Sequence, residues 1–261
     1  MSADVPEDQV EPPFEPAPEP APPPEPVGGD LVYRHRLSTR IWHWLNALSV
    51  FVMLMSGMMI LNAHPRLYWG SYGANPDHAW LELGTMPFPG WATIPGHYDL
   101  AGARSWHFLF AWLLVVPGLL YWLWSFLNRH IQRDLAPRRE ELSPRHLWND
   151  VKDHARLRFP TGAAARDYNI LQKAAYLGVL FALLPLAVLT GLTLSPGMDS
   201  AWPWLLDLFG GRQSARSLHF IAAAGIAAFI LVHLLMVVLA GPINEVRSMI
   251  TGRYRLPQDK P

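Results

Sequence analysis

Apolar residues gather in four stretches, and each is long enough to cross a lipid bilayer as a helix. About 20 consecutive, mostly apolar residues span the hydrocarbon core. The stretches cover residues 41–61, 105–127, 169–194 and 214–240. This pattern predicts an all-α membrane protein, a bundle of four transmembrane helices. Lys173 lies in the first turn of the third helix, where we expect its long side chain to extend to the membrane interface.

Polar segments set the boundaries of the predicted membrane domain. Residues 1–30 contain ten prolines and eight acidic residues but no Lys or Arg. Such a segment has too little apolar surface to form a core, so its composition predicts a disordered tail. The membrane domain is then expected over residues 31–255, followed by a short tail over residues 256–261.

Lys and Arg residues predict the orientation of the bundle. The connection 128–168 carries nine of them, whereas the connection 62–103 carries one, Arg66. Cytoplasmic connections are the ones enriched in Lys and Arg. We therefore expect both termini and the 128–168 connection of this multi-pass protein in the cytoplasm, and the first and third connections in the periplasm or its equivalent.

The two long connections carry different side chains. The connection 62–103 is rich in aromatic residues, which suit either an interfacial belt or a docking surface for a partner outside the membrane. In the other connection, Ser143 and Pro144 are residue types that begin a helix. We expect this helix to lie on the inner membrane surface, with Arg138 and Arg139 near anionic lipid.

Four histidines lie inside the apolar stretches, where a polar side chain is costly and usually functional. His107 and His219 begin the second and fourth helices, so both lie at outer depth. His233 is 14 residues beyond His219, about 21 Å along the same helix face, and shares the inner depth of His43. Depth therefore pairs His107 with His219 and His43 with His233. The alternative is that all four are buried polar residues that hydrogen-bond across helices.

The two pairs predict two b-type haems, each ligated between two imidazoles. The chain has no cysteine, which excludes disulfides, iron–sulfur ligation and covalently attached c-type haem. A zinc site is disfavoured because no carboxylate clusters with either pair. The zero net charge and the lack of a separate basic stripe give no reason to expect nucleic acid as a partner.

Several residues near the histidines are candidates for holding the haems. Residues 103–108 nearly repeat at 215–220, which predicts two similar walls of the outer site. Three arginines precede a histidine by three residues and are expected to pair with haem propionates. They are Arg40, Arg104 and Arg216. Three glycines are expected to let the macrocycle approach the backbone, and they are Gly57, Gly118 and Gly225. Membrane flanks and ordinary helix packing are the alternatives for these two groups.

The histidine positions resemble those of the four-helix dihaem cytochromes b of the bacterial b561 and nickel-hydrogenase group, which includes formate dehydrogenase gamma subunits. The resemblance covers about residues 31–255. Three segments look like the cytochrome b subunit of thiosulfate-reductase type. They are His-Pro-Arg-Leu-Tyr-Trp-Gly at 64–70, Ile-Pro-Gly-His-Tyr-Asp-Leu at 94–100 and Tyr-Asn-Ile-Leu-Gln-Lys at 168–173. The acidic tail departs from the family pattern.

This resemblance implies electron transfer between membrane quinone and a periplasmic catalytic subunit, often a molybdopterin enzyme. It also implies a quinone site near the inner haem, to which Asn169 and His233 contribute. Helix capping is the alternative for Asn169. Another possible function is a stand-alone b561-type enzyme that passes electrons from a small outer donor, such as superoxide, to quinone. A haem-free scaffold or transporter is the non-redox alternative.

Overall fold

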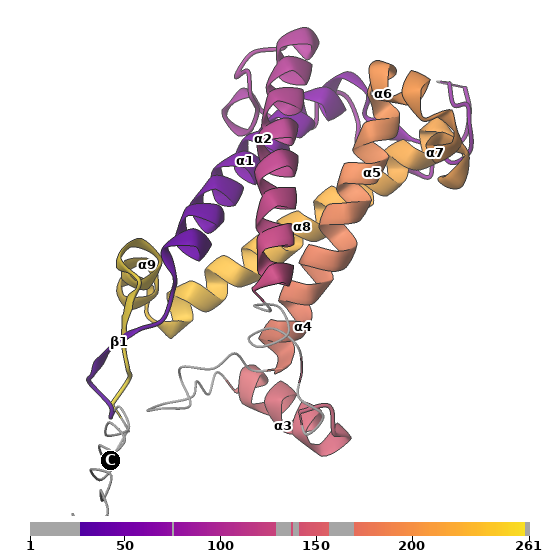
Figure 1. The fold of residues 1–261 in the computed structure, drawn as a ribbon. Coiled ribbons are helices and arrows are strands. Elements are labelled where there is room, and N and C mark those ends of the chain that lie inside the picture. Colours follow the sequence, from indigo (N-terminus) through magenta and orange to yellow (C-terminus); the bar gives the residue numbers. More distant parts are fainter. Residues whose placement is uncertain (1–26, 75, 129–136, 138–140, 157–169, 259–261) are drawn as a thin grey trace, which may run out of the picture.

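A computed structural model describes most of the chain (Figure 1). The described residues are 27–74, 76–128, 137, 141–156 and 170–258. Asn169, Arg138 and Arg139 lie outside them, as does most of the expected disordered tail over residues 1–30.

Four helices are long and apolar enough to cross a membrane, as the sequence predicts. Three are continuous: α1 (Leu37–Ala63), α2 (Leu100–Leu127) and α8 (Arg212–Ala240). The third span is built from α4 (Ile170–Gly178), the π-helical segment Val179–Leu183 and α5 (Leu184–Leu194). Pro185 has no N–H to donate to the carbonyl four residues earlier, which explains why the helix widens just before it.

The four spans pack as two hairpins. α1 packs mainly on α2, and α5 packs mainly on α8. The buried residues of α1 recur every three or four positions, so they form one stripe. They are Ser49, Val52, Ser56, Met59 and Asn62. Small and polar side chains therefore line the interior, while the exposed surface of the helix is largely apolar and suited to lipid.

The first and last described segments of the chain lie at one end of the bundle, which we call the terminal end (Figure 1). Here β1 (Leu31–Tyr33) pairs antiparallel with β4 (Arg253–Arg255), next to α9 (Pro242–Thr251). The helix α3 (Pro144–Ala155) lies at the same end. Four membrane crossings require this arrangement, because an even number of crossings returns the chain to the side on which it began.

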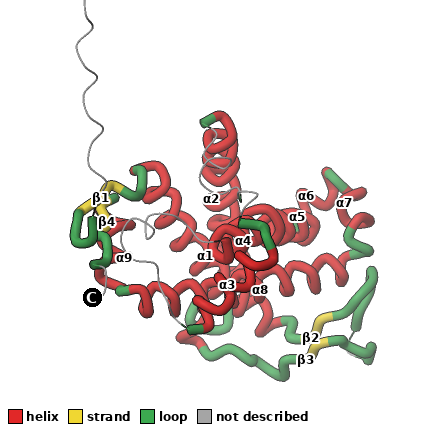
Figure 2. Tube along the Cα trace, turned by 90° about the horizontal axis from the view of Figure 1, so that it is seen from below, coloured by secondary structure: helices red, strands yellow, loops and turns green. Residues whose placement is uncertain are grey.

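The opposite end, which we call the loop end, carries the connections after α1 and α5. A hairpin of β2 (Arg66–Leu67) and β3 (Leu81–Glu82) and the 3-10 turn η1 (Gly90–Ala92) lie between α1 and α2. Two short helices, α6 (Pro196–Ala201) and α7 (Pro203–Leu208), precede α8. Figure 2 shows that the β2–β3 hairpin and the β1–β4 ribbon lie on opposite sides of the bundle when it is seen from below.

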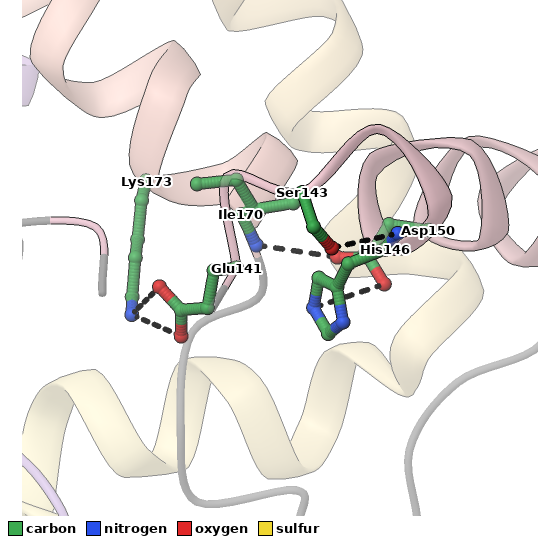
Figure 3. A network of polar contacts seen from close by, with 6 residues as sticks. All are labelled: Glu141, Ser143, His146, Asp150, Ile170 and Lys173. Atoms are coloured by element: carbon green, nitrogen blue, oxygen red, sulfur yellow. Dashed lines mark hydrogen bonds and ion pairs between the residues drawn. The ribbon is translucent and has the colours of Figure 1, made fainter. Parts of the chain in front are cut away.

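Lys173, which the sequence predicts at the membrane interface, is paired with a carboxylate of the connection before α3. Its side chain is buried, and Nζ donates to both carboxylate oxygens of Glu141 at 2.8 Å (Figure 3). The start of α3 brings this carboxylate beside α4, and pairing replaces hydration of the ammonium group. The helix expected at Ser143 is confirmed: α3 begins there, with the Ser143 hydroxyl accepting from the His146 N–H at 3.4 Å.

Candidate functional site

The bundle brings the four intramembrane histidines together in two pairs. The imidazole centroids of His107 on α2 and His219 on α8 are 6.1 Å apart. Those of His43 on α1 and His233 on α8 are 6.4 Å apart. These are the pairs that depth predicts, and each joins the α1–α2 hairpin to the α8 helix.

Both separations suit two imidazoles that bind one metal ion from opposite sides. A metal–imidazole nitrogen bond is about 2 Å long, so such rings have centroids about 6 Å apart. A ligating imidazole also needs its second nitrogen held by a hydrogen bond, which sets the tautomer. His219 meets this need, because its Nδ1 lies 2.9 Å from the Ala187 carbonyl oxygen. A carbonyl only accepts, so Nδ1 carries the proton and Nε2 keeps its lone pair for a metal.

Hydroxyl groups hold the second nitrogen of both histidines at the loop end. Ser56 Oγ on α1 lies 3.0 Å from His107 Nδ1, and Thr190 Oγ1 on α5 lies 3.1 Å from His219 Nδ1. Each hydroxyl donates its proton to a carbonyl of its own helix: Ser56 to Val52 at 2.8 Å and Thr190 to Leu186 at 2.6 Å. Each oxygen is therefore left to accept the imidazole N–H, which leaves Nε2 of His107 free as well.

A glycine follows each of these hydroxyl residues and faces the same imidazole. A Cβ at Gly57 would lie 3.6 Å from His107 Cε1, and one at Gly191 would lie 3.2 Å from His219 Cε1. Gly57 was predicted from the sequence, whereas Ser56, Thr190 and Gly191 were not. A signal for them exists, since a hydroxyl residue followed by glycine occurs within the first and the third apolar stretch.

The pair at the terminal end is held differently. His43 Nδ1 is buried and has no hydrogen-bond partner among the described residues. The His43 ring meets Trp44 edge-on at 5.1 Å, and the His233 ring stacks on Phe229 at 5.9 Å. An unpaired buried polar atom is costly, and a bound polar group would remove that cost. The donor set and the free nitrogen therefore also suit a bis-histidine haem.

The three arginines have different surroundings. Arg216 donates through Nη2 to the His64 carbonyl oxygen, and its Nη1 lies 3.4 Å from Gln213 Oε1. The Arg104 guanidinium lies 5.9 Å from the Phe108 ring centroid. Burial lowers the pKa of His64, and the nearby charges of Arg216 and Arg104 lower it further, so both arginines are close to this residue. Their pairing with propionates stays a prediction.

Arg40 and the remaining glycines complete the set proposed from sequence. Arg40 Nε is buried without a hydrogen-bond partner in the described part of the chain. A Cβ at Gly118 would lie 2.9 Å from Trp42 Cη2, and one at Gly225 would lie 3.1 Å from Leu183 Cδ2. Both glycines thus admit a side chain of a neighbouring helix, the arrangement of ordinary membrane helix packing.

The segment that contains both histidine pairs matches a known protein family. A model of the prokaryotic cytochrome b561 family matches residues 34–252, which include all four histidines. The chain belongs to this family. Membership implies that the cytochrome binds haem b, and the four apolar helices identify it as a multi-pass membrane protein.

Curated relatives of this cytochrome are named as subunits of oxidoreductases. It is 32% identical over 200 residues to a putative protein-methionine-sulfoxide reductase subunit, YedZ1, of Azospira oryzae, covering 77% of this chain and 87% of that one. It is 24% identical over 245 residues to a probable Ni/Fe-hydrogenase B-type cytochrome subunit of Azotobacter vinelandii, covering 88% and 91%. A putative cytochrome, YdhU, of Escherichia coli is 26% identical over 241 residues, covering 87% and 76%.

The cytochrome anchors its aromatic connection on the start of α8, two residues before His219. Ser217 Oγ donates to the Tyr68 carbonyl oxygen at 2.6 Å and accepts a hydrogen bond from the Trp80 indole N–H at 2.8 Å. The equivalent serine of the near-repeat, Ser105, instead donates to Ala101 of its own helix at 3.1 Å. The two copies of the motif therefore share the histidine but differ in the use of the serine.

Proposed function

We propose that this cytochrome holds two b haems and transfers electrons between the quinone pool and a catalytic oxidoreductase subunit outside the membrane. His107 and His219 would ligate one iron, and His43 and His233 the other. The observation that carries the proposal is that both pairs meet about 6 Å apart at two depths of one bundle. When bound, haem supplies reversible one-electron oxidation and reduction.

The depth of the pairs supports a relay. His219 and His233 lie on the same helix, 14 residues or about 21 Å apart along its axis. The helix fixes this separation, and the apolar bundle keeps the imidazoles of His219 and His233 neutral and oriented. Electrons that enter at one end of the bundle then have a second centre near the other end.

The loop end supports docking of a catalytic partner. Trp69, Tyr72 and Trp91 are exposed there, with Tyr72 at 90% and Trp91 at 84%. Trp69 stacks on Trp80 at 5.5 Å, and Trp80 is hydrogen-bonded to Ser217 close to His219. Exposed aromatic side chains on a well-anchored loop are typical of protein interfaces. Relatives named as subunits agree with such a partner, and the resemblance to the thiosulfate-reductase type favours a molybdopterin enzyme.

The quinone site is proposed at the terminal end, near Asn169 and His233. The family resemblance motivates this assignment. The nine Lys and Arg residues of the 128–168 connection favour a cytoplasmic location for that end in a bacterial inner-membrane protein. The quinone would exchange with the membrane pool, whereas the haems would stay bound.

The test is to purify the cytochrome from membranes and measure haem and bound proteins together. We expect a pyridine-haemochromogen ratio of two haems per chain, released by acid acetone because no cysteine attaches them. A co-purifying catalytic subunit would agree with the proposal. One haem per chain would contradict the pairing, and a dihaem protein that reduces quinone from superoxide without any partner would favour the stand-alone alternative.

A further inference from the structure

A basic pocket at the terminal end is lined by none of the four paired histidines. It has a volume of about 420 Å³ and is lined by Leu31, Arg247, Thr251, Arg253 and Arg255. That volume falls within the range of small-molecule sites, about 300–1,000 Å³. Three guanidinium groups and no carboxylate line it, so it is suited to an anion.

The pairing of β1 with β4 gathers these residues on one face. Leu31 lies opposite Arg255, and Tyr33 lies opposite Arg253. Residues directly opposite each other in an antiparallel pair point to the same face, and alternate residues along a strand share it. All four are exposed, whereas Tyr254 between the two arginines is buried on the other face. The strand pairing thus keeps Arg253 and Arg255 exposed to solvent or membrane.

No carboxylate of the described residues neutralises the charges of the pocket. None of Arg247, Arg253 and Arg255 forms an ion pair with a carboxylate within the described part of the chain. Arg247 Nη2 donates to Asn244 Oδ1 at 2.7 Å, but its buried Nε has no partner among the described residues. An arginine with free N–H groups is well suited to bind a phosphate oxygen.

The pocket also lies beside an exposed apolar stripe on α9. Ile243, Val246 and Ile250 share one side of this helix, with exposed fractions of 84%, 40% and 58%. Arg247 lies four residues after Ile243, and Thr251 lies four residues after Arg247. These two lining residues of the pocket therefore run along the edge of the stripe. A helix with an apolar side next to basic residues is typical of one that lies in the membrane interface.

The end of α8 places α9 at the membrane surface. The spanning helix ends at Ala240 and α9 begins at Pro242. The residue between them, Gly241, has a φ of 109°, a conformation that L side chains rarely adopt. The chain therefore turns sharply where it leaves the bilayer, and Figure 1 shows α9 turned out of the line of α8.

We propose that this pocket binds the phosphate of an anionic membrane phospholipid, with the acyl chains lying along the apolar stripe of α9. Arg253, Arg255 and Arg247 supply the charge, while Leu31 and Ile243 supply the apolar contact. The proposal does not depend on which side of the membrane the terminal end faces, because the pocket adjoins the surface at which α8 ends.

Native mass spectrometry of the purified, haem-loaded cytochrome tests this inference. Phosphatidylglycerol and phosphatidylcholine with the same acyl chains are titrated into the detergent-solubilised protein. We expect the wild type to bind phosphatidylglycerol preferentially and R253Q/R255Q to bind it about 25-fold more weakly, because each arginine near an anionic surface contributes about a factor of five. R36Q is the matched control, because Arg36 is exposed at the same end but lies outside the pocket. Its affinity for phosphatidylglycerol should stay within about twofold of the wild-type value.

Two further arms separate a lipid from a soluble anion. Inorganic phosphate in millimolar excess should not displace phosphatidylglycerol, and I243S/I250S should weaken its binding. Displacement by inorganic phosphate together with no effect of I243S/I250S would overturn the lipid assignment. An equal loss of affinity for phosphatidylglycerol in R36Q and R253Q/R255Q would contradict binding at the pocket, because the effect would then come from the overall charge of this end. If R253Q/R255Q does not purify, R253K/R255K keeps the charge and must retain the lipid preference.

Discussion

At the scale of single residues, hydroxyl groups set the state of the imidazoles at the loop end. Ser56 and Thr190 each give their only proton to a helix carbonyl, at 2.8 and 2.6 Å, and accept the Nδ1 proton of a histidine. Helical serine and threonine commonly bond backward in this way. Here the bond also decides which imidazole nitrogen is available to a metal.

Replacing Ser56 with alanine should raise the midpoint potential of one haem. An acceptor on Nδ1 makes the imidazole a stronger base, which favours ferric iron, and its removal favours the ferrous state. A neutral hydrogen bond contributes about 0.5–1.5 kcal/mol and 1 kcal/mol per electron is about 43 mV, so we expect a rise of at most some tens of millivolts. Redox titration with optical detection measures this shift.

Ser49→Ala provides the matched control for Ser56→Ala. Ser49 lies on the same buried stripe of α1, but its Oγ has no hydrogen-bond partner among the described residues. Both midpoints should stay at their wild-type values in this variant. Unchanged midpoints in Ser56→Ala as well would show that the hydroxyl does not act on the iron.

Single histidine variants should sort into two spectral classes. His107→Ala and His219→Ala are expected to remove the same component of the reduced-minus-oxidised spectrum, since their rings are 6.1 Å apart. His43→Ala and His233→Ala should remove the other component. Low-temperature difference spectra resolve the two, and loss of the same component in His107→Ala and His43→Ala would contradict the pairing.

At the scale of elements, the structure shows how the long connection at the loop end is attached. Its hairpin is held to α8 by Ser217 and by Ser214, whose Oγ accepts the Gly70 N–H at 2.7 Å. Asn62 at the end of α1 adds a second attachment, because its amide exchanges two hydrogen bonds with the Phe88 backbone, at 2.8 and 2.9 Å. The connection proposed as the docking surface is thus fixed relative to the histidine pair at the loop end.

Ser217→Ala should loosen this connection without removing haem. It deprives the Trp80 indole N–H and the Tyr68 carbonyl of their partner, which costs about 1–3 kcal/mol for each buried group left unpaired. Hydrogen exchange of residues 66–82 should become faster, measured by mass spectrometry. Ser105→Ala is the control, because Ser105 occupies the same place in the near-repeat but bonds only within α2. Equal exchange in both variants would mean that Ser217 is not the anchor.

The attachment of α3 to α4 predicts a stability effect. Lys173→Met should lower the thermal midpoint of the solubilised protein, because it removes the ammonium group that pairs with Glu141 beside α4. Breaking a buried pair costs about 3–5 kcal/mol, and the partial exposure of Glu141 lowers that figure. The double variant Lys173→Met/Glu141→Gln should recover much of the loss. A double variant no more stable than the single one would show that the charge itself does not matter.

At the scale of the whole molecule, the two ends of the bundle are predicted to have different functions. Asn169→Phe should block haem reduction by a quinol analogue and leave both haem spectra intact, because it fills the proposed quinone site at the terminal end. Trp69→Ala/Trp91→Ala should retain quinol-driven reduction and lose electron exchange with the partner. Stopped-flow spectroscopy measures both rates. The reverse outcome, with quinol-driven reduction lost only in the loop variant, would put the quinone site at the loop end.

The sequence by itself determined the features that depend on distance along the chain. Span lengths follow from the apolar stretches, and the depth of each histidine follows from the fixed rise of a helix, which is why the two pairs were predictable. The start of α3 was predictable from Ser143 and Pro144, because a helix cap is a local hydrogen bond. Family membership was also predictable, because the spacing of histidines within one helix can be read from the sequence.

Only the tertiary structure decided which distant residues meet. Ser56 and His107 are 51 positions apart, and Trp80 and Ser217 are 137 apart, so no local pattern joins them. The same reason explains why the partner of Lys173 was not predicted: Glu141 is 32 positions away in the sequence. The basic pocket needs β1 to pair with β4 across the whole chain. Helix geometry sets depth, but the rotation and contacts of packed helices come from side chains filling the space between them.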